Sequence, residues 1–239
     1  MNEPSPSTEP LRGPPSPPGG EGLDVIDAWL FDLDDTLYPE ETGIMDLIRA
    51  RITAFVMRIT GLDEDEARQV QRGWFEVHGA SLPGLLKEHD VSVEDFLMDI
   101  HDVPLDAVKS DPRLTAALAR LPGRRFVFTN GSSGHAGRVL EKLGVADLFE
   151  GVFHIESGGL IPKPDPRTFQ AVIDQFGLDP RRAAFFEDTE RNLKPAADLG
   201  MTTILIGDHA LASRASFVHH RAERLTPFLE SIPVAEPAP

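Results

Sequence analysis

Short hydrophobic runs of strand length alternate with amphipathic helical segments along most of the chain. Five runs rich in Val, Ile, Phe and Trp are too short for a helix, and we expect strands at 23–31, 125–129, 151–155, 183–188 and 202–206. Apolar residues recur at helical spacing between them, at 114–121, 135–143, 166–176 and 191–199. Strands that alternate with helices form a parallel sheet with both faces covered. The pattern therefore predicts an α/β fold built on a doubly wound, Rossmann-like parallel sheet.

Residues 40–110 interrupt this alternation. Every element predicted there is a helix, and we expect four, at 44–59, 63–77, 82–89 and 92–101. Asp63 can cap the second helix, and three acids follow it in the first turn, where they favour the helix dipole. We interpret 40–110 as an all-helical domain inserted into a core domain that is formed by 23–39 and 111–232.

The two ends of the chain differ in composition from the rest. Residues 1–22 and 233–239 are rich in Pro, Gly and Glu with few apolar side chains, and we expect disordered tails there. The Pro-rich start could also dock a partner as a polyproline helix. It lacks the hydrophobic centre of a signal peptide, and no apolar stretch reaches the roughly 18 residues of a membrane helix. We therefore expect a cytoplasmic protein that has no membrane partner.

Composition and charge exclude several kinds of function. The formal net charge of −16 argues against nucleic acid as a partner, because a phosphate backbone is bound by clustered Lys and Arg. The chain has no cysteine, which excludes disulfides, zinc–thiolate sites and thiol catalysis. A Mg2+ site built from oxygen ligands remains open.

Reactive side chains follow four of the predicted strands. Asp32 and Asp34 come directly after the first strand, two residues apart and so on roughly the same side of an extended backbone. Burying unpaired carboxylates costs several kcal/mol each, so a positive partner is expected there. The carboxyl ends of parallel strands share one ligand-binding crevice. The residues expected to join the two acids there are Thr129, Asn130, Gly131, Lys163, Glu187 and Asp188.

Four of these stretches, taken in order, resemble the motifs of the haloacid dehalogenase (HAD) superfamily. They are Asp32-Leu-Asp-Asp-Thr36, Thr129-Asn130, Lys163 within Ile161-Pro-Lys-Pro-Asp-Pro166, and Glu187-Asp188; the resemblance covers residues 23–206. The helical insert resembles the type-one cap of that superfamily. Finer features, at 32–39, 128–131, 135–140 and 185–192, resemble its pyrimidine 5′-nucleotidase branch.

The resemblance implies a Mg2+-dependent phosphomonoester hydrolase that works through an aspartyl-phosphate. Asp32 is then the nucleophile, since a carboxylate can attack phosphorus and divide the hydrolysis into two steps. Asp34 is the general acid and then the general base, and its backbone carbonyl is a metal ligand. Mg2+ offsets the repulsion between these carboxylates and a phosphate, and it is held by Asp32, Asp34 and the pair Glu187 and Asp188. Which member of that pair binds the metal directly stays open.

Phosphate binding is implied for the remaining motif residues. Lys163 supplies a point charge for the transferring phosphoryl group. The Thr129 hydroxyl, with the main-chain N–H groups around Asn130 and Gly131, holds phosphoryl oxygens between a strand end and a helix start. Each role has a plain alternative, in which Lys163 is a solvated loop lysine and Thr129 an ordinary strand-end residue.

Other residues carry two interpretations. Asn192, one helical turn after Asp188, is either a partner of the metal ligands or plain helix surface. His135 is either near the substrate or simply exposed to solvent. Three residues of the insert could approach a nucleotide base, although aromatic side chains at helical spacing more often form a core. They are Trp74, Phe75 and His78.

The predicted function is hydrolysis of a small phosphorylated metabolite, with a pyrimidine nucleoside monophosphate (UMP or CMP) as the expected substrate. A HAD phosphatase for another small metabolite, such as phosphoglycolate or a sugar phosphate, and a phosphosugar mutase are the enzymatic alternatives. Dehalogenation needs neither Asp34 nor Mg2+ and is disfavoured. A non-catalytic phosphate-binding module remains an alternative on the same fold, although the intact acids and Lys163 speak against it. Monomer and homodimer both stay open.

Overall fold

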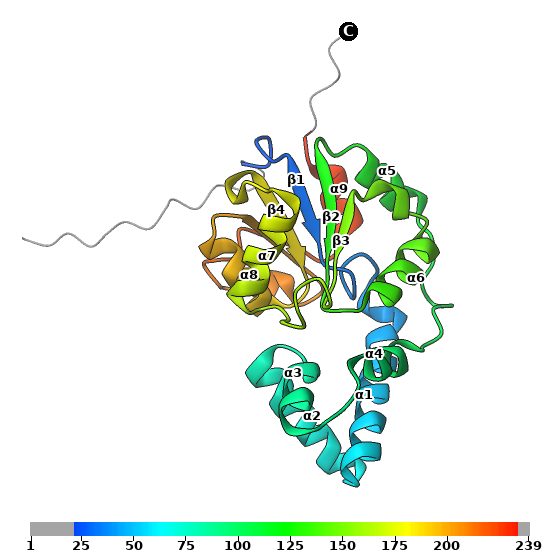
Figure 1. Ribbon diagram of the computed structural model, residues 1–239. Coiled ribbons are helices and arrows are strands. Elements are labelled where there is room, and N and C mark those ends of the chain that lie inside the picture. The colour runs from blue at the N-terminus through cyan, green and yellow to red at the C-terminus, as the bar shows by residue number, and fades with distance from the viewer. Residues whose placement is uncertain (1–21, 234–239) are drawn as a thin grey trace, which may run out of the picture.

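The computed structural model describes residues 22–233, which form a six-stranded parallel sheet with helices on both faces (Figure 1). The strands are β1 (Ala28–Phe31), β2 (Arg124–Phe128), β3 (Gly151–Phe153), β4 (Ala183–Glu187), β5 (Thr202–Ile206) and β6 (His220–Ala222). Their order is β3-β2-β1-β4-β5-β6, and neighbouring strands are parallel. The predicted fold class is therefore confirmed. The tails predicted at 1–22 and 233–239 lie outside the described residues, apart from Gly22 and Pro233.

Two details of the sheet differ from the prediction. β1 begins at Ala28 and not at residue 23, because the preceding residues form a turn in which the Ile26 N–H donates to the Leu23 carbonyl (3.3 Å). The structure also contains a strand, β6, that no hydrophobic run predicts. It pairs with β5 at the edge of the sheet, and of its three residues only His220 is buried.

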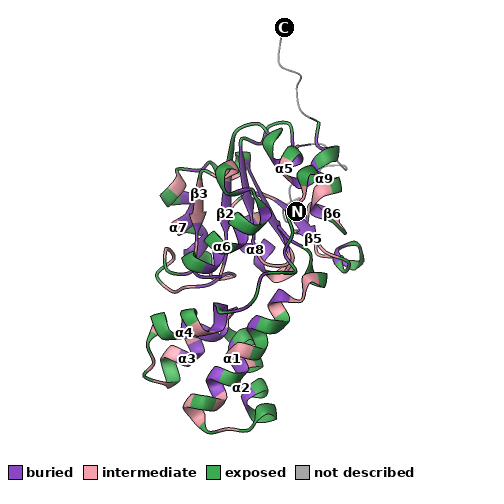
Figure 2. Cartoon of the chain, turned by 90° about the vertical axis from the view of Figure 1, so that its right-hand side faces the viewer, coloured by how far each residue is buried: buried purple, intermediate pink, exposed green. Residues whose placement is uncertain are grey.

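Side chains of β1 alternate between two apolar layers. Trp29 and Phe31 enter one layer and Ala28 and Leu30 the other, and none is more than 3% exposed. The first layer is covered by α5 (Pro112–Ala119), α6 (Ser133–Leu143) and α9 (Leu225–Ser231), and the second by α7 (Pro166–Phe176) and α8 (Glu190–Asp198). All residues of β1 and β4 are buried, and Figure 2 shows most of the middle of the sheet as buried. Each large side chain buried there stabilises the fold by about 1.5–3 kcal/mol, so β1 and β4 are rigid supports for the residues at their ends.

Capping side chains fix where the helices next to the strand ends begin. The Ser132 hydroxyl accepts a hydrogen bond from the His135 N–H (3.3 Å), so α6 starts at Ser133, two residues earlier than predicted. Asp165 accepts from the Arg167 N–H (2.9 Å), and Pro166 occupies the first position of α7. These two caps anchor the loops that follow β2 and β3.

Residues 40–110, which follow β1, contain four α-helices with an apolar cluster of their own. They are α1 (Ile44–Thr60), α2 (Glu64–His78), α3 (Ser81–Glu88) and α4 (Val93–His101). Phe55, Trp74, Leu85 and Phe96 lie in this cluster, and the rings of Phe55 and Phe96 meet edge to face with 5.0 Å between their centres. Asp63 caps α2 in a reciprocal capping box with Glu66. Figure 1 shows these helices at the carboxyl ends of the strands.

Between residues 22 and 233, no helix combines the length and the apolar character that crossing a bilayer requires.

Candidate active site

Three carboxylates meet at the adjacent ends of β1 and β4. Asp32 directly follows β1, and its N–H donates to the Phe186 carbonyl on β4 (2.9 Å). Glu187 is the last residue of β4 and Asp188 follows it. Phe31 and Phe186 are paired in register, so the acids beyond them leave the sheet at the same level. One oxygen from each of Asp32, Glu187 and Asp188 lies within 4.8 Å of the other two.

Lys163 is the cation of this cluster. Its side chain is 1% exposed, and Nζ donates to Asp32 Oδ1 (2.6 Å), Glu187 Oε2 (2.7 Å) and the Phe128 carbonyl (2.9 Å). All three ammonium protons are therefore used. The interpretation of Lys163 as a solvated loop lysine is wrong, because the chain turns it inward from the loop between β3 and α7.

Asn130 explains why this loop points inward. Its side-chain amide donates to the Lys163 carbonyl (3.2 Å), and its Oδ1 accepts from the Lys163 N–H (2.8 Å). Both main-chain polar groups of the lysine are thus held by one side chain from the end of β2. The sequence motif does not reveal this use of the Asn130 side chain, because the two residues become neighbours only in the fold.

One lysine does not neutralise three carboxylates, of which Asp32 and Glu187 are buried and Asp188 is half-buried. Burial and the nearby Glu187 raise the pKa of Asp32 to about 8. Burial raises the pKa of Glu187 to about 7, and burial together with Asp32 raises that of Asp188 to about 7. Burial by itself would lower the pKa of Lys163, but its carboxylate partners raise it. The site therefore favours a further positive charge, and its hard oxygen donors fit a divalent cation such as Mg2+.

Asp34 faces the same pocket but is held apart from this cluster. Its Oδ1 accepts from the Tyr38 hydroxyl (2.5 Å) and from His135 Nε2 (2.7 Å). Burial alone would raise the pKa of Asp34, but the charge and hydrogen bond of His135 and the bond from Tyr38 hold it below its usual value. His135 is 1% exposed, so the interpretation of this ring as solvent-exposed is wrong. Tyr38 was not among the predicted site residues. Its position four residues after Asp34 was the feature of the sequence that could have indicated its place in the site.

The loop after β2 provides small polar groups. Thr129 is 2% exposed, and its hydroxyl accepts from the Gly131 N–H (2.9 Å). A side chain at Gly131 would crowd this hydroxyl and the His135 ring, since a Cβ there would lie 3.2 Å from each. The loop runs into the N-terminus of α6, where main-chain N–H groups and the helix dipole favour an anion.

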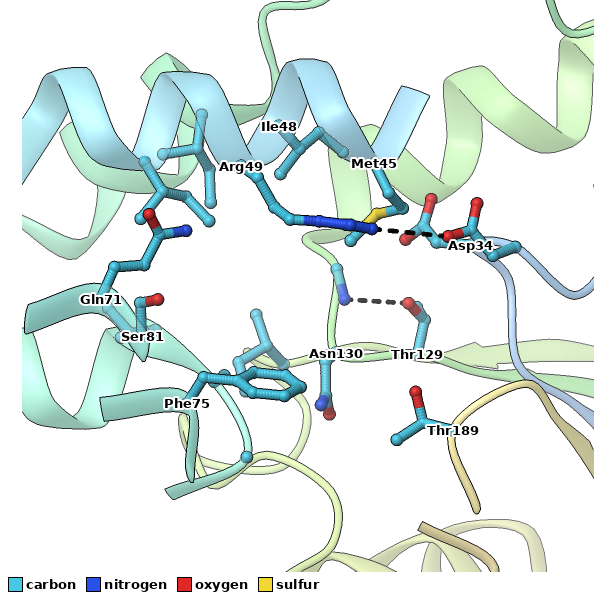
Figure 3. Close-up of a pocket in the computed structure, with 18 of the residues that line it drawn as sticks. Asp34, Met45, Ile48, Arg49, Gln71, Phe75, Ser81, Thr129, Asn130 and Thr189 are labelled. Atoms are coloured by element: carbon cyan, nitrogen blue, oxygen red, sulfur yellow. Dashed lines mark hydrogen bonds and ion pairs between the residues drawn. The ribbon is translucent and has the colours of Figure 1, made fainter. Parts of the chain in front are cut away.

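A pocket of about 740 Å³ joins these groups to the helical insert. The carboxylates, Lys163 and Thr129 line one part of it. In Figure 3, Phe75 and Gln71 reach into the pocket from the insert side. Arg49 also lines the pocket, with its guanidinium 3.9 Å from Asp35. The space is large enough for a small organic molecule that has one end at the carboxylates.

The aromatic residues of the insert have different places. Trp74 is 5% exposed and belongs to the apolar cluster of the insert, and its indole N–H donates to Glu88 (3.0 Å). Phe75 is 47% exposed and lines the pocket. His78 lines a separate cavity of about 250 Å³. Of the three, Phe75 is therefore the one placed to touch a bound molecule in the main pocket.

Two residues of α8 connect this helix with the site. Arg191 donates to the Phe75 carbonyl (2.9 Å) and lies over the Phe75 ring at 4.0 Å, which links α8 to the end of α2. Asn192 lines the pocket and is 6% exposed, so its interpretation as helix surface is wrong. Its Oδ1 is buried and has no hydrogen-bond partner among the residues that the structure describes.

Comparison with known sequences agrees with this geometry. A family model described as haloacid dehalogenase-like hydrolase matches residues 26–200. Phosphate metabolism protein 8 of Saccharomyces cerevisiae is 31% identical over 193 residues, or 74% of this chain and 60% of that protein, so the chain spans about three fifths of its length. Glyceraldehyde 3-phosphate phosphatase of Methanopyrus kandleri is 29% identical over 199 residues, which cover 76% of this chain and 84% of that protein.

Solved structures show the same fold at lower identity. A HAD phosphatase from Thermococcus onnurineus superimposes with a TM-score of 0.58 and 22% identity, over 86% of this chain and 97% of that one. The HAD hydrolase YfnB from Bacillus subtilis, a structure bound to magnesium, gives a TM-score of 0.58 at 14% identity, over 87% and 99% of the two chains.

Proposed function

The chain belongs to the haloacid dehalogenase-like hydrolases, and we propose that it is a Mg2+-dependent phosphomonoesterase whose substrate is a pyrimidine nucleoside 5′-monophosphate. The observation that carries this proposal is the group of three carboxylates, two buried and Asp188 half-buried, with Lys163 bonded to the two buried ones, in a metabolite-sized pocket. Asp32, with Glu187 or Asp188, would hold the metal. When bound, Mg2+ supplies positive charge that offsets the carboxylates and polarises the phosphate.

Hydrolysis would proceed in two steps on the residues of this chain. A carboxylate oxygen of Asp32 forms a bond to phosphorus while the bond from phosphorus to the leaving oxygen breaks, and Asp34 gives that oxygen a proton. Asp34 then takes a proton from a water molecule, whose oxygen attacks phosphorus and releases Asp32 and inorganic phosphate. Lys163 supplies positive charge beside the phosphoryl group while its protons stay hydrogen-bonded to Asp32, Glu187 and the Phe128 carbonyl, and the loop at Thr129 holds the phosphoryl oxygens in both steps.

The insert side of the pocket supports a nucleoside as the leaving group. Phe75 offers a half-exposed ring on which a base can stack. Gln71 Oε1 accepts from the Thr53 hydroxyl (2.7 Å), which leaves the amide N–H groups of Gln71 to donate to a base carbonyl. A smaller sugar or triose phosphate is the second candidate, because the archaeal relative named above is a glyceraldehyde 3-phosphate phosphatase.

A phosphate-release screen tests both candidates. The purified protein is given UMP, CMP, AMP, glyceraldehyde 3-phosphate, phosphoglycolate and a hexose phosphate, first with Mg2+ and then with a chelator. We expect the highest kcat/KM with UMP or CMP and no release with chelator. A preference for the triose phosphate would support the second candidate, whereas conversion of a sugar phosphate without phosphate release would indicate a mutase.

A matched pair of variants tests the place of the base. Phe75→Leu should raise KM for UMP about tenfold and leave KM for a triose phosphate unchanged, because stacking on an aromatic ring is worth about 1–3 kcal/mol per base. Phe75→Trp, which keeps an aromatic face, should retain the KM of the unmodified protein. Equal effects of Phe75→Leu on both substrates would contradict a base at this position.

A further inference from the structure

We propose that Tyr38 and His135 are positioning residues that hold Oδ1 of Asp34 and leave its Oδ2 to exchange the proton with the leaving group and with water. The proposal rests on the phosphatase activity proposed above. It assigns different tasks to the two oxygens of one carboxylate.

Two buried donors converge on the same oxygen. The Tyr38 hydroxyl lies 2.5 Å from Asp34 Oδ1, and His135 Nε2 lies 2.7 Å from it. A carboxylate can only accept, so the His135 Nε2–H is the donor to Asp34. Nδ1 of His135 is buried and has no hydrogen-bond partner among residues 22–233, so the bond to Asp34 is the one hydrogen bond that fixes this ring among them. Burial and the neighbouring Asp34 raise the pKa of the Tyr38 phenol, so this group stays a donor.

The other oxygen of Asp34 faces the pocket. Oδ2 lies 3.5 Å from the position that a Cβ on Gly131 would occupy, next to the Thr129 hydroxyl. That is the loop proposed to hold the phosphoryl group. An oxygen that already accepts two hydrogen bonds is a poorer proton acceptor than its free neighbour, so a proton taken up by Asp34 is placed on Oδ2.

The His135 ring is itself fixed by the last helix of the insert. His101, at the end of α4, stacks on it with 4.6 Å between ring centres and an interplanar angle of 14°. His101 Nδ1 lies 3.0 Å from the Leu97 carbonyl, which can only accept, and 2.9 Å from the Ser132 hydroxyl oxygen. The same hydroxyl caps the helix that carries His135. The ring plane of His135 is thus set from both sides of the pocket.

The proton transfers balance with this assignment. In the first step the O–H bond at Asp34 Oδ2 breaks and the proton goes to the departing alkoxide oxygen as its bond to phosphorus breaks. In the second step Oδ2 takes a proton from the attacking water, and the Asp32 carboxylate leaves phosphorus. Tyr38 and His135 keep their own protons in both steps.

Leaving-group dependence tests the proposal. An alkyl phosphate such as a nucleoside monophosphate needs a proton on its leaving oxygen, whereas p-nitrophenolate leaves without one. General acid catalysis contributes about 100- to 10,000-fold, so a misplaced carboxyl should lose about 10- to 100-fold. For Tyr38→Phe and His135→Leu we expect that loss in kcat with the nucleotide and little change in KM. The initial burst of p-nitrophenol from p-nitrophenyl phosphate should stay within about threefold.

The controls separate orientation from folding. His135→Gln keeps an N–H at the reach of Nε2 and should recover most of the nucleotide turnover that His135→Leu loses. His154→Leu, at a histidine that pairs with Glu156 away from Asp34, controls for the loss of an imidazole. Thermal unfolding of each variant is measured alongside.

Three results would overturn the proposal. They are full nucleotide turnover in His135→Leu, an equal loss in the p-nitrophenol burst, and no recovery in His135→Gln. The unmodified protein distinguishes this failure from that of the proposed function. If it releases no phosphate from any substrate with Mg2+, the phosphatase assignment itself falls.

Discussion

The stability of the metal-free protein should fall as the pH rises above neutrality. Asp32, Glu187 and Asp188 have pKa values of about 8, 7 and 7 in the folded protein, against ordinary values of 3.8, 4.5 and 3.8. At intermediate pH the folded protein therefore binds more protons than the unfolded chain, and the free energy of unfolding decreases with rising pH.

The structure sets the scale of this effect. A difference of three pH units between folded and unfolded pKa corresponds to about 4 kcal/mol. The three groups share one lysine and titrate together, so we use this value for the cluster and not for each acid. Between pH 6.5 and pH 8, one excess bound proton gives a loss of about 2 kcal/mol, a substantial part of the 5–15 kcal/mol typical of a domain.

Urea unfolding followed by Trp fluorescence measures this loss, with EDTA and with Mg2+. The pH range of the measurement starts at about 6.5 because of His101. Burial lowers the pKa of this residue to about 4, so below the ordinary histidine pKa the unfolded chain binds the extra proton and the free energy of unfolding rises with pH. Mg2+ at 100 times its Kd should add about 2.7 kcal/mol, since it binds only the folded state.

Asp188→Asn removes one of the repelling charges. We expect this variant to be more stable than the unmodified protein at pH 8 in EDTA and to gain little from Mg2+. A free energy of unfolding that rises with pH in EDTA, or that ignores Mg2+, would refute this reasoning.

Three further predictions concern single residues. Asp32→Asn should abolish phosphate release and leave the urea midpoint near that of the unmodified protein, because an amide is nearly isosteric but a poor nucleophile; substantial turnover would exclude Asp32 as the attacking group. Lys163→Met should lower the free energy of unfolding by about 3–5 kcal/mol, because it leaves buried carboxylates without their cation. Its control is Lys194→Met at an exposed ion pair, which should lower the free energy of unfolding by less than about 1 kcal/mol. Gly79→Ala should reduce both stability and phosphate release, since a Cβ there would lie 2.1 Å from the Lys163 carbonyl oxygen. Its control is Gly61→Ala, also at positive φ but in open space, which should leave phosphate release unchanged.

The parallel sheet and the acids at its edge could be predicted because their signals are local. Apolar runs that stop at Asp32 and at Glu187 are visible in the sequence, and strand-end chemistry in parallel sheets follows from topology. Eight of the nine α-helices in the described residues were also visible from their spacing, although their starts shifted, whereas α9 (Leu225–Ser231) was not predicted. β6 was missed because His220, Arg221 and Ala222 form no hydrophobic run, and pairing with β5 makes them a strand.

The burial of polar residues could not be predicted, because it depends on contacts between distant parts of the chain. His135 carries no local sign that it is buried, and the ring that covers it, His101, belongs to the insert. Lys163 is turned inward by Asn130 and neutralised by acids from two strands. Neither the stacking of His101 on His135 nor the contacts of Lys163 join residues that are close in the sequence.

The helical insert leaves the sheet after β1 and returns ahead of β2, and these two strands are hydrogen-bonded neighbours. A segment of this kind can lengthen, shrink or be exchanged during evolution without breaking the strand ladder that supports the acids. New substrate preferences can therefore arise by recombination at this one place, while descendants inherit the hydrolytic machinery unaltered.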